Sequence, residues 1–358
     1  MKHILVFNYG SSSLKYALFE QLQAKVRENV KIDGVEDCQK VVRQVIANTE
    51  RIDAIAHRVV HGMDLDSPLP INEETIEKLK SLVSLSPLHN RLALAGIEVC
   101  LQELPQVPQY AIFDTSFFRE LPFTSRAYAL PLEFYERGIK RYGFHGISYS
   151  YLLKETARLL GKELKGLSAI MLHLGSGASA CAVYKGKPID TSMGMTPLEG
   201  LVMSSRAGDL DPGILLHLLR ERSPEELEHL LYNQCGVKGL TGSKDIGKMV
   251  QQAQEGDPIA QRALELYVYR IKKYIGAYYA VLPEVDALVF SGGVGENSPV
   301  VRELVCKGLE KLGIVLDESL NKGKDLPLFI NSPDSKLKIL VIKTDEELEM
   351  ARQLLERV

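Results

Sequence analysis

Hydrophobic and polar positions follow the same pattern at two distant places in the chain. Residues 4–19 read ILVFNYGSSSLKYALF, and residues 169–184 read AIMLHLGSGASACAVY. Each stretch is an apolar run, one polar residue, a Gly-Ser turn and a second strand-like run, which predicts a β-hairpin. Laid together without a gap, Gly10 falls on Gly175 and Ser11 on Ser176. The pattern favours two copies of one hairpin, although two unrelated hairpins would also produce it.

The elements predicted after each hairpin also repeat. The first is followed by a third strand near 25–31, a helix near 38–47, the buried strand IDAIAHRVV, helical stretches and the strand YAIFDT. The second is followed by KPIDTSM, several helices, VDALVF, a further helix and LKILVI. This order predicts two similar α/β domains with a cleft between them. We expect the domains to span 1–147 and 148–344, and the last helix, 345–358, could pack back on the first domain.

Three helix starts are marked by residue types that cap helices. Asp257 before Pro258 and Ser298 before Pro299 each predict an N-cap followed by proline in the first turn. Thr344 and Glu347 have the spacing of a capping box, which predicts that the last helix begins after Thr344.

Four segments place glycine or small polar residues directly after an apolar strand, where α/β proteins bind ligands. They are Asn8–Lys15, Phe113–Ser116, His173–Ser179 and Ser291–Asn297. A single segment would be explained as a turn. Four together favour a nucleotide-phosphate site, because such turns gather backbone N–H groups and hydroxyls. The segment Ser291–Asn297 is neither a Walker loop nor a dinucleotide fingerprint, since no Lys-Ser/Thr follows it and its glycines are too close together.

Charged residues near these segments could act on an acidic substrate. Arg58 ends a buried strand and Arg206 follows a loop rich in glycine and serine. An arginine can bind a carboxylate or a phosphate through two hydrogen bonds, although each could also form a surface ion pair. Asp114 and Glu346 lie at strand ends and could hold Mg²⁺ through water. The histidines lack zinc-ligand spacing and no G-x-S-x-G elbow occurs, which disfavours zinc and covalent hydrolase chemistry.

Composition limits the partners and the compartment. The 358 residues include 43 Lys and Arg against 46 Asp and Glu, a net charge of −3, which disfavours nucleic acid or an anionic membrane as the main partner. No apolar run approaches the ~18 residues of a membrane span. The five cysteines lie far apart, without C-x-x-C spacing. This favours a reducing cytoplasm.

Taken together, these segments resemble the acetokinase (acetate kinase) family of the acetate and sugar kinase/Hsc70/actin superfamily. The matching stretches follow the family's order from residue 8 to residue 348. They are NYGSSSLK, HRVVHG, SPLHN, FDTSF, RYGFHG, HLGSG, MGMTPLEGL, RAGDLDP, GGVGEN and TDEEL.

The resemblance implies a fold, a reaction and a set of catalytic residues. The fold would be two duplicated ribonuclease-H-like (actin-like ATPase) domains around a catalytic cleft, assembled as a homodimer. The reaction would be reversible, direct in-line transfer of a phosphoryl group between ATP and acetate, giving ADP and acetyl phosphate, with Mg²⁺ or Mn²⁺ as cofactor. The residues implied as catalytic are Arg58, Asp114, His145 and Arg206, with Asn8 and Glu346 positioning the metal.

In such enzymes the two arginines bind the carboxylate and the transferring phosphoryl group, and His145 would hydrogen-bond that group in the transition state. Asp114 would orient the arginine or the metal shell. The pocket for the acetate methyl group would be formed, beside Arg58, by Val60, Leu88, Phe144 and Pro197. The nucleotide contacts would be Lys15, His173, Gly175, Ser176, Gly177, Asp245, Gly293, Val294, Gly295 and Asn297.

The chain departs from the family pattern mainly around the nucleotide. Ser176 stands where the family usually has asparagine, and residues 245–247 read Asp-Ile-Gly instead of Asp-Phe-Arg. The second change removes a stacking ring and a cation. Phe118 and Tyr149 replace two histidines that are usual in the family. The chain is also some tens of residues shorter, chiefly between the first hairpin and His57.

Three interpretations follow from these residues. The first is acetate kinase, with propionate as a close substitute, because one methylene in an apolar pocket changes binding by only ~1–3 kcal/mol. The second keeps the transfer but takes pyrophosphate or another nucleotide as donor, prompted by Ile246 and Gly247. The third is an actin- or Hsc70-like ATP-driven binding module. That module would not need two arginines, His145 and a methyl pocket converging on an acceptor.

Overall fold

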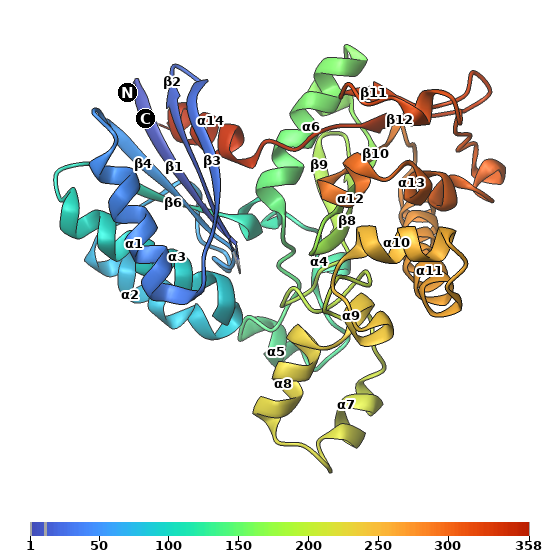
Figure 1. Ribbon diagram of the computed structural model, residues 1–358, viewed down its shortest axis with the longest axis horizontal. Coiled ribbons are helices and arrows are strands. Elements are labelled where there is room, and N and C mark those ends of the chain that lie inside the picture. Colours follow the sequence, from blue (N-terminus) through green and yellow to red (C-terminus); the bar gives the residue numbers. More distant parts are fainter. Residues whose placement is uncertain (1, 11–12, 358) are drawn as a thin grey trace. The chain divides into compact units, whose positions relative to one another are not determined.

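The computed structural model describes residues 2–10 and 13–357, and gives Leu88 a backbone position only. The chain divides into two compact units (Figure 1). Unit 1 comprises Met1–Arg119, Phe144–Tyr151 and Asp345–Val358, and unit 2 comprises Glu120–Gly143 and Leu152–Thr344. Within the described residues, no helix combines the length and the apolar character needed to cross a membrane.

Unit 1 is built on a six-stranded mixed sheet with the order β3-β2-β1-β4-β6-β5. Its strands are β1 (His3–Tyr9), β2 (Ser13–Glu20), β3 (Gln23–Lys31), β4 (Ala54–Val59), β5 (Leu69–Pro70) and β6 (Gln109–Phe113). Strands β1, β4 and β6 run parallel, while β2, β3 and β5 pair antiparallel with their neighbours. The parallel strands therefore end at the same edge of the sheet.

Helices bury both faces of this sheet, and successive residues of a strand point to opposite faces. Leu5, Phe7 and Tyr9 of β1 pack in one core with helices α1 (Gly34–Ala47), α2 (Glu73–Ser81) and α3 (Pro87–Glu103) (Figure 1). Ile4 and Val6 belong to a second core, which contains helix α14 (Glu346–Arg357). Helix α6 (Gly146–Leu160) begins in unit 1 and continues into unit 2.

Unit 2 repeats this architecture. Its strands are β7 (Ala169–Leu174), β8 (Ala178–Tyr184), β9 (Lys187–Thr191), β10 (Ala287–Ser291), β11 (Leu328–Phe329) and β12 (Lys338–Val341). Their order, β9-β8-β7-β10-β12-β11, and their directions match those of unit 1 strand for strand. The predicted duplicated α/β fold, of the ribonuclease-H-like kind, is confirmed.

The remaining helices of the chain lie in unit 2. They are α4 (Phe123–Arg126), α5 (Leu132–Glu136), α7 (Pro212–Leu218), α8 (Pro224–Asn233), α9 (Gly236–Thr241), α10 (Ile246–Gln254), α11 (Pro258–Val281), α12 (Gly292–Asn297) and α13 (Pro299–Cys306). Short 3₁₀ turns occur at Val83–Leu85, Asp114–Phe118, Leu164–Gly166, Glu310–Leu312 and Leu320–Lys322.

Two of the three predicted helix starts are confirmed. Asp257 caps α11 by accepting two backbone N–H groups, and Ser298 caps α13 in the same way with one. The third prediction is wrong. The N–H of Leu348 donates to the Asp345 carboxylate at 2.9 Å, so Asp345 caps α14 in place of Thr344. The side chain of Glu347, which the capping box would have used, accepts a hydrogen bond from Asn8 instead.

The two hairpins differ by one residue in their first turn. The last strand pair before the turn is Tyr9 with Leu14 in unit 1, but Leu174 with Ala178 in unit 2. The gapless alignment is therefore correct up to Gly10. In the second strands, β2 and β8, equivalent positions are displaced from it by one residue. The next turn is the same in both units, since its two residues have positive φ (50° and 66° at 21–22, 49° and 77° at 185–186). That geometry is typical of tight hairpins.

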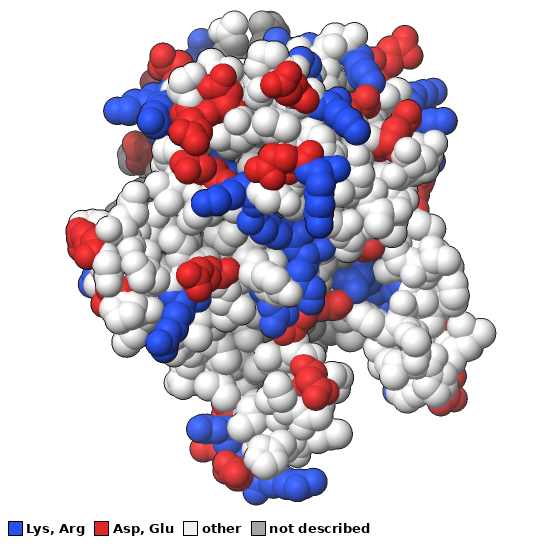
Figure 2. All heavy atoms as spheres, turned by 90° about the vertical axis from the view of Figure 1, so that its right-hand side faces the viewer, with Lys and Arg blue, Asp and Glu red and all other residues white. Residues whose placement is uncertain are grey.

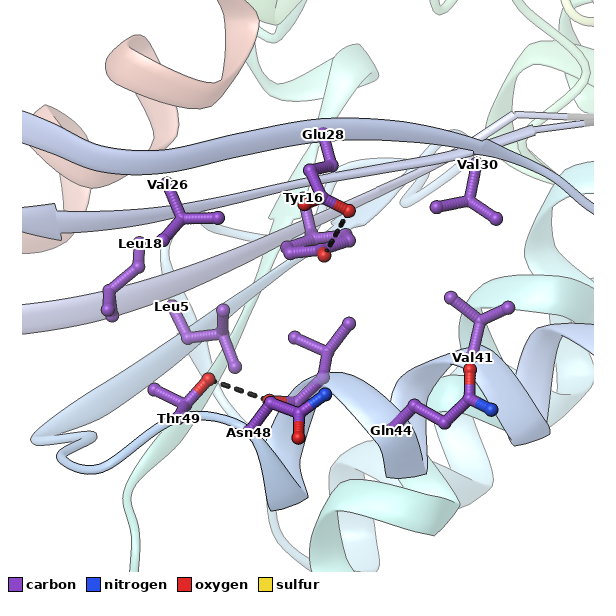
Figure 3. A pocket seen from close by; sticks show the side chains of 11 residues that line it. Leu5, Tyr16, Leu18, Val26, Glu28, Val30, Val41, Gln44, Asn48 and Thr49 are labelled. Atoms are coloured by element: carbon purple, nitrogen blue, oxygen red, sulfur yellow. Dashed lines mark hydrogen bonds between the residues drawn. The ribbon is translucent and has the colours of Figure 1, made fainter.

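A cavity of about 370 Å³ lies between α1 and strands β1–β3 (Figure 3). The hydroxyl of Tyr16 donates to the Glu28 carboxylate at 2.6 Å inside it. Burial, together with this hydrogen bond, raises the pKa of Tyr16 to about 12. Leu5 of β1 also lines the cavity. The cavity therefore lies on the face of the sheet that packs against α1.

Candidate functional site

Three polar side chains end the parallel strands of unit 1 on the face that α14 covers. We call Asn8 of β1, Arg58 of β4 and Asp114, directly after β6, the strand-end triad. Two residues earlier on these strands, Val6, Ala56 and Ile112 are apolar and packed in the core with α14. Because side chains alternate along a strand, the triad continues this face at the point where the sequence changes from apolar to polar.

Arg58 forms the centre of the triad. Its Nε and Nη2 donate to the two carboxylate oxygens of Asp114 at 3.1 and 2.7 Å, and its Nη1 donates to Asn8 Oδ1 at 2.8 Å. The Asp114 side chain is 1% exposed and that of Arg58 13%. Burial alone would lower the pKa of Arg58, but Asp114 and Glu346 raise it above its ordinary value. These bonds to the described residues use three of the five N–H groups of the guanidinium, which leaves two for an anion.

The start of helix α14 adds two carboxylates. Asn8 Nδ2 donates to Glu346 Oε2 at 2.9 Å and to Glu347 Oε1 at 2.6 Å. Glu346 Oε2 also lies 3.5 Å from Arg58 Nη1. Three carboxylates, counting Asp114, thus surround one arginine. This excess of negative charge favours binding of a cation.

The donor set fits a hard divalent metal ion. Such ions prefer oxygen ligands, and Mg²⁺ needs only one or two carboxylates beside water and phosphate oxygens. No group of three His, Cys, Asp or Glu that could hold a metal occurs among residues 2–10 and 13–357. A metal ion bound by Glu346 near Asn8 would therefore complete its coordination with water and a substrate phosphate.

His145 is held beside the triad by a strained backbone. Its φ is 59°, which is uncommon for a residue other than glycine, and its N–H donates to the Asp114 carboxylate. The next residue must be glycine, because a Cβ on Gly146 would lie 1.9 Å from the Asp114 carbonyl oxygen. Burial raises the pKa of Asp114, while Arg58 and the His145 N–H act against that rise.

Two of the predicted methyl-pocket residues are buried in unit 1. Val60 is 6% exposed and Phe144 is 1% exposed. The Phe144 ring packs edge-on against His61, with 5.3 Å between the ring centroids. Asn90 of α3 fixes this turn by accepting from the His61 N–H at 3.1 Å and donating to the His61 carbonyl at 2.9 Å. The side chain of Leu88 lies outside the described residues.

In unit 2, Pro197 and Arg206 lie in the long connection after β9. Arg206 Nη1 donates to the Pro197 carbonyl at 2.8 Å. Arg206 has no carboxylate partner among the described residues. Burial lowers the pKa of Arg206 to about 10, which the nearby Tyr232 opposes, so the side chain keeps its charge at neutral pH. A half-buried cation without a counterion is typical of an anion-binding position.

Helix α9 holds the backbone that carries Arg206. The N–H groups of Cys235, Val237 and Lys238 donate to the carbonyls of residues 205, 203 and 204 at 2.9–3.0 Å. Gly236 has a φ of 61°, and a Cβ there would lie 2.2 Å from the Met203 carbonyl oxygen. The first turn of α9 is thus pressed against residues 203–206 and takes up their carbonyl groups.

Nine of the ten predicted nucleotide residues lie in unit 2, where they are grouped on three segments. The turn after β7 is closed by the Gly175 N–H, which donates to the Gly177 carbonyl at 3.0 Å, and the Ser176 carbonyl accepts from the Ser204 N–H at 3.0 Å. The turn 175–177 is therefore hydrogen-bonded directly to the segment 203–206, which carries Arg206. His173, the last residue but one of β7, pairs with Ser291 of β10. Lys15 lies in unit 1, paired with Asn8 across the first hairpin.

The second segment follows β10. Gly292 approaches β7 so closely that a Cβ would lie 2.7–2.8 Å from the Leu174 backbone. Asn297 Nδ2 donates to the Gly293 carbonyl at 2.9 Å, across the turn that contains Val294 and Gly295. A Cβ added to Gly293 would have no other atom within 4 Å. The surface beside Gly293 is therefore open.

The third segment is the start of α10. The Asp245 carboxylate caps the helix by accepting from the Lys248 N–H at 3.0 Å. Ile246 is 4% exposed and belongs to the buried side of α10. It therefore presents no flat surface for a nucleotide base, and Gly247 carries no side chain.

Three residues that hold site residues of their own unit are not predicted from the sequence as site residues: Glu347 and Asn90 in unit 1 and Glu296 in unit 2. Glu347 was assigned to a capping box, and only its bond to Asn8, distant in sequence, shows its position. Asn90 lies within the matched stretch SPLHN but has no charge to mark it. Glu296 accepts from the N–H groups of Gly292 and Thr344 at 3.0 and 3.1 Å and so holds the segment after β10.

Comparison with known proteins shows the family to which the chain is similar. The family model of the acetokinase family matches residues 37–352. The acetate kinase of Sulfurovum sp. (strain NBC37-1) is 43% identical over 385 residues, which cover 98% of this chain and 97% of that protein.

Two solved structures have nearly the same fold. The acetate kinase of Porphyromonas gingivalis has a TM-score of 0.88 at 35% identity, and a propionate kinase from Francisella tularensis subsp. tularensis SCHU S4 has 0.89 at 36%. Both comparisons cover 99% of each chain. Because the family model matches most of the residues and the relatives align over nearly their full length, the chain belongs to the acetokinase family.

Proposed function

We propose that this protein is an acetate kinase, which reversibly transfers the γ-phosphoryl group of ATP to acetate and gives ADP and acetyl phosphate. The observation that carries the proposal is Arg206, a half-buried cation that has no carboxylate partner among the described residues and hydrogen-bonds Pro197. It needs an anion to offset its charge. The triad in unit 1 supplies a second arginine, Arg58, with N–H groups left for another anionic oxygen.

The roles of the charged residues follow from phosphoryl-transfer chemistry. The transferred group carries charge on its equatorial oxygens, so catalysis depends on positioning and electrostatic stabilisation. Arg58 and Arg206 would bind the carboxylate and the phosphoryl oxygens. Asp114 fixes the plane of Arg58 through two hydrogen bonds. His145, held beside Asp114, would donate to the phosphoryl group as the transfer proceeds.

The acetate methyl group needs an apolar pocket. Val60 and Phe144 are the buried apolar candidates in unit 1, and Pro197 would contribute from its loop in unit 2. Leu88 stays part of this proposal on the sequence alone. Burying one methyl group contributes about 0.8 kcal/mol, so the arginines must supply most of the affinity.

Glu346 and Asn8 are the residues proposed to position Mg²⁺. The ion would neutralise charge on the phosphates and so favour approach of the acetate carboxylate. Glu347, which accepts from the same Asn8 amide, would hold that amide in place.

The nucleotide is proposed to bind unit 2. The turn 175–177 and the segment 293–297 present backbone groups at strand ends, next to His173. Asp245 would face the base or the ribose, and Lys15 would contact the phosphates from the first hairpin.

The proposal is tested by trapping acyl phosphate with hydroxylamine. Purified protein, ATP, Mg²⁺ and acetate should give acetyl hydroxamate, whereas omission of acetate should give none. Absence of product from folded protein in both reaction directions would contradict the proposal.

Propionate is the second candidate acceptor. A relative with nearly the same fold is named a propionate kinase. The same assay with acetate, propionate and butyrate compares the three by kcat/KM. We expect acetate to lead propionate by less than about 100-fold, because one methylene is worth only ~1–3 kcal/mol.

Pyrophosphate or a different nucleotide is the second candidate donor. The observation that favours it is the buried Ile246 beside Gly247, which gives α10 no ring to stack on adenine. Replacing ATP by GTP or pyrophosphate in the trapping assay decides this. Product with pyrophosphate alone would change the donor and leave the proposed acceptor site intact.

We also propose that two copies of the chain associate. Helix α7 is short and exposes apolar side chains, and a second copy is the occupant that would cover them. They are Ile214, 44% exposed, and Leu216, 67%, within the helix, and Leu219, 44%, directly after it. Light scattering should give the mass of a dimer, and Leu216→Asp should shift it toward the monomer. A monomeric wild-type protein would contradict this.

The surface charge and the cysteines support the proposed partners and compartment. Acidic and basic side chains are intermingled over the face shown in Figure 2, without the single-sign surface that binds nucleic acid. The five cysteines, all within the described residues, are free thiols. Free thiols are typical of a reducing cytoplasm, where we propose that the protein acts.

A further inference from the structure

A partly buried polar cluster in unit 2 supports the connection that carries Pro197 and Arg206. Its centre is an ion pair in which Arg141 Nη2 donates to Glu199 Oε1 at 2.6 Å. The hydroxyl of Tyr128 donates to the other carboxylate oxygen of Glu199 at 2.5 Å. The Arg141 guanidinium also lies 5.5 Å from the centre of the Tyr128 ring. Each group of the cluster is thus fixed by the other two.

Arg141 also hydrogen-bonds the backbone at the start of the connection, which we define as residues 191–209. Its Nη1 donates to the carbonyls of Thr191 and Met193 at 3.1 and 3.0 Å, and its Nε donates to the Ser125 carbonyl at 3.1 Å. One planar side chain therefore ties two chain segments to Glu199. Lysine could not do this, because its ammonium lacks the planar arrangement of five donors.

The chain turns tightly around this cluster between Met193 and Glu199. A Cβ on Gly194 would lie 1.8 Å from Glu199 Oε2 and 2.2 Å from the Tyr128 hydroxyl. The Met195 N–H donates to the same hydroxyl at 2.9 Å. The path of residues 193–199 is thus set by the cluster, and Pro197 lies on that path.

A second set of contacts closes the rest of the connection. The Asp209 carboxylate accepts from the Gly200 N–H at 2.8 Å and from the Tyr274 hydroxyl of α11 at 2.8 Å. The Asp209 N–H returns a hydrogen bond to the Gly200 carbonyl at 3.0 Å. Residues 200–209, which include Arg206, therefore form a closed loop whose base follows Glu199 directly.

We infer that Arg141, Glu199 and Tyr128 form a positioning cluster for the phosphoryl transfer. The cluster touches neither substrate, and it acts by holding residues 191–209 so that Arg206 and the Pro197 carbonyl keep one arrangement. The inference rests on the proposed role of Arg206. A displacement of about 1 Å at such a residue can lower the rate by roughly 100-fold, so this support matters for turnover.

The inference is tested with Tyr128→Phe and Glu199→Gln. Tyr128→Phe removes one hydroxyl and keeps the ring, and Glu199→Gln keeps the shape and removes the charge. We expect kcat to fall about 10-fold in the first and about 100-fold in the second. The KM for ATP should change less than kcat, because the turn 175–177 joins this connection at Ser204, inside the loop that Asp209 closes without the cluster. Glu120→Gln, which removes an exposed ion pair with Lys187 (2.9 Å) in the same unit, is the matched control.

Amide hydrogen exchange distinguishes positioning from general stability. The inference requires faster exchange in peptides from 192–209, with the rest of unit 2 as protected as in the Glu120→Gln control. Normal kcat in a folded variant, unchanged exchange in 192–209, or faster exchange throughout unit 2 would each overturn it. If the wild-type protein makes no acyl phosphate, the proposed function fails, and the exchange of 192–209 in the two variants still decides whether the cluster holds this connection.

Discussion

At the residue scale, the two arginines of the candidate site differ in how their charge is offset. Arg58 is paired with Asp114 through two hydrogen bonds, and this attraction raises its pKa. Arg206 hydrogen-bonds only a carbonyl among the described residues, and burial lowers its pKa. Removing Arg58 would leave a buried carboxylate without its partner. Removing Arg206 would relieve an uncompensated charge.

This contrast predicts that replacing each arginine by methionine has different effects on the free energy of unfolding. Arg58→Met should lower the free energy of unfolding by about 3–5 kcal/mol, because Asp114 would be left buried and unpaired. Arg206→Met should change it by less than about 1 kcal/mol, or raise it. Urea unfolding of both variants beside the wild type measures this. Equal losses in the two variants would contradict the difference in pairing.

A second residue-scale prediction concerns His57, which lies in a buried chain of hydrogen bonds. Its Nδ1 is 2.9 Å from the Tyr9 hydroxyl and its Nε2 is 3.0 Å from Gln109 Oε1. Burial lowers the pKa of His57 from 6.5 to about 4. The unfolded chain binds a proton at His57 more readily than the folded protein does. The contribution of neutral His57 to the free energy of unfolding is therefore complete above about pH 6.5 and is lost as the pH falls toward 4.

The size of this effect is on the order of 2 kcal/mol between pH 7.5 and pH 5, as the two pKa values imply. Urea unfolding at both pH values should show that His57→Gln, which does not titrate, lacks this part of the loss. Gly276→Ala, on α11 of unit 2, serves as a control that keeps the histidine. An equal pH dependence in wild type and His57→Gln would show that His57 is not held neutral.

At the scale of elements, the duplicated sheets end in different chemistry. When the strand pairings of one sheet are carried over to the other, the unit 2 counterparts of the strand-end triad are His173, Ser291 and Thr344. The triad contains an ion pair, whereas the Ser291 hydroxyl and the Thr344 N–H donate to Glu296 Oε1 at 3.3 and 3.1 Å. The equivalent strand ends thus carry an arginine and an aspartate in unit 1, but a serine and a threonine in unit 2.

Two glycines at helix positions give a prediction at this scale. Gly146→Ala should destabilise the protein by about 1–3 kcal/mol and lower kcat, since its Cβ would meet the Asp114 carbonyl oxygen and displace His145. Gly276→Ala, inside α11 with nothing within 4 Å of the Cβ position, should stabilise it by about 0.5–1 kcal/mol. Thermal unfolding and kcat of both variants test this. A Gly146→Ala protein with normal kcat would contradict the proposed placement of His145.

At the scale of the whole molecule, the fold and most strand-end residues could be predicted from the sequence because their signals are local. A strand followed by glycine and a polar residue is visible within ten positions. The contacts that complete the site are not local. Asn8 meets Glu347 across 339 positions, and Arg141 meets Glu199 across 58. The one-residue difference between the hairpin turns was also hidden, because Gly and Ser fill both.

The proposed function requires both Arg58 and Arg206 for the transfer of a phosphoryl group from ATP to acetate. The most direct test is the rate of acetyl hydroxamate formation by wild type, Arg58→Ala and Arg206→Ala, with Glu120→Gln as control. We expect turnover by the wild type and the control, and a loss of at least about 1,000-fold in each arginine variant that remains folded. Near-wild-type turnover by either folded arginine variant would contradict it.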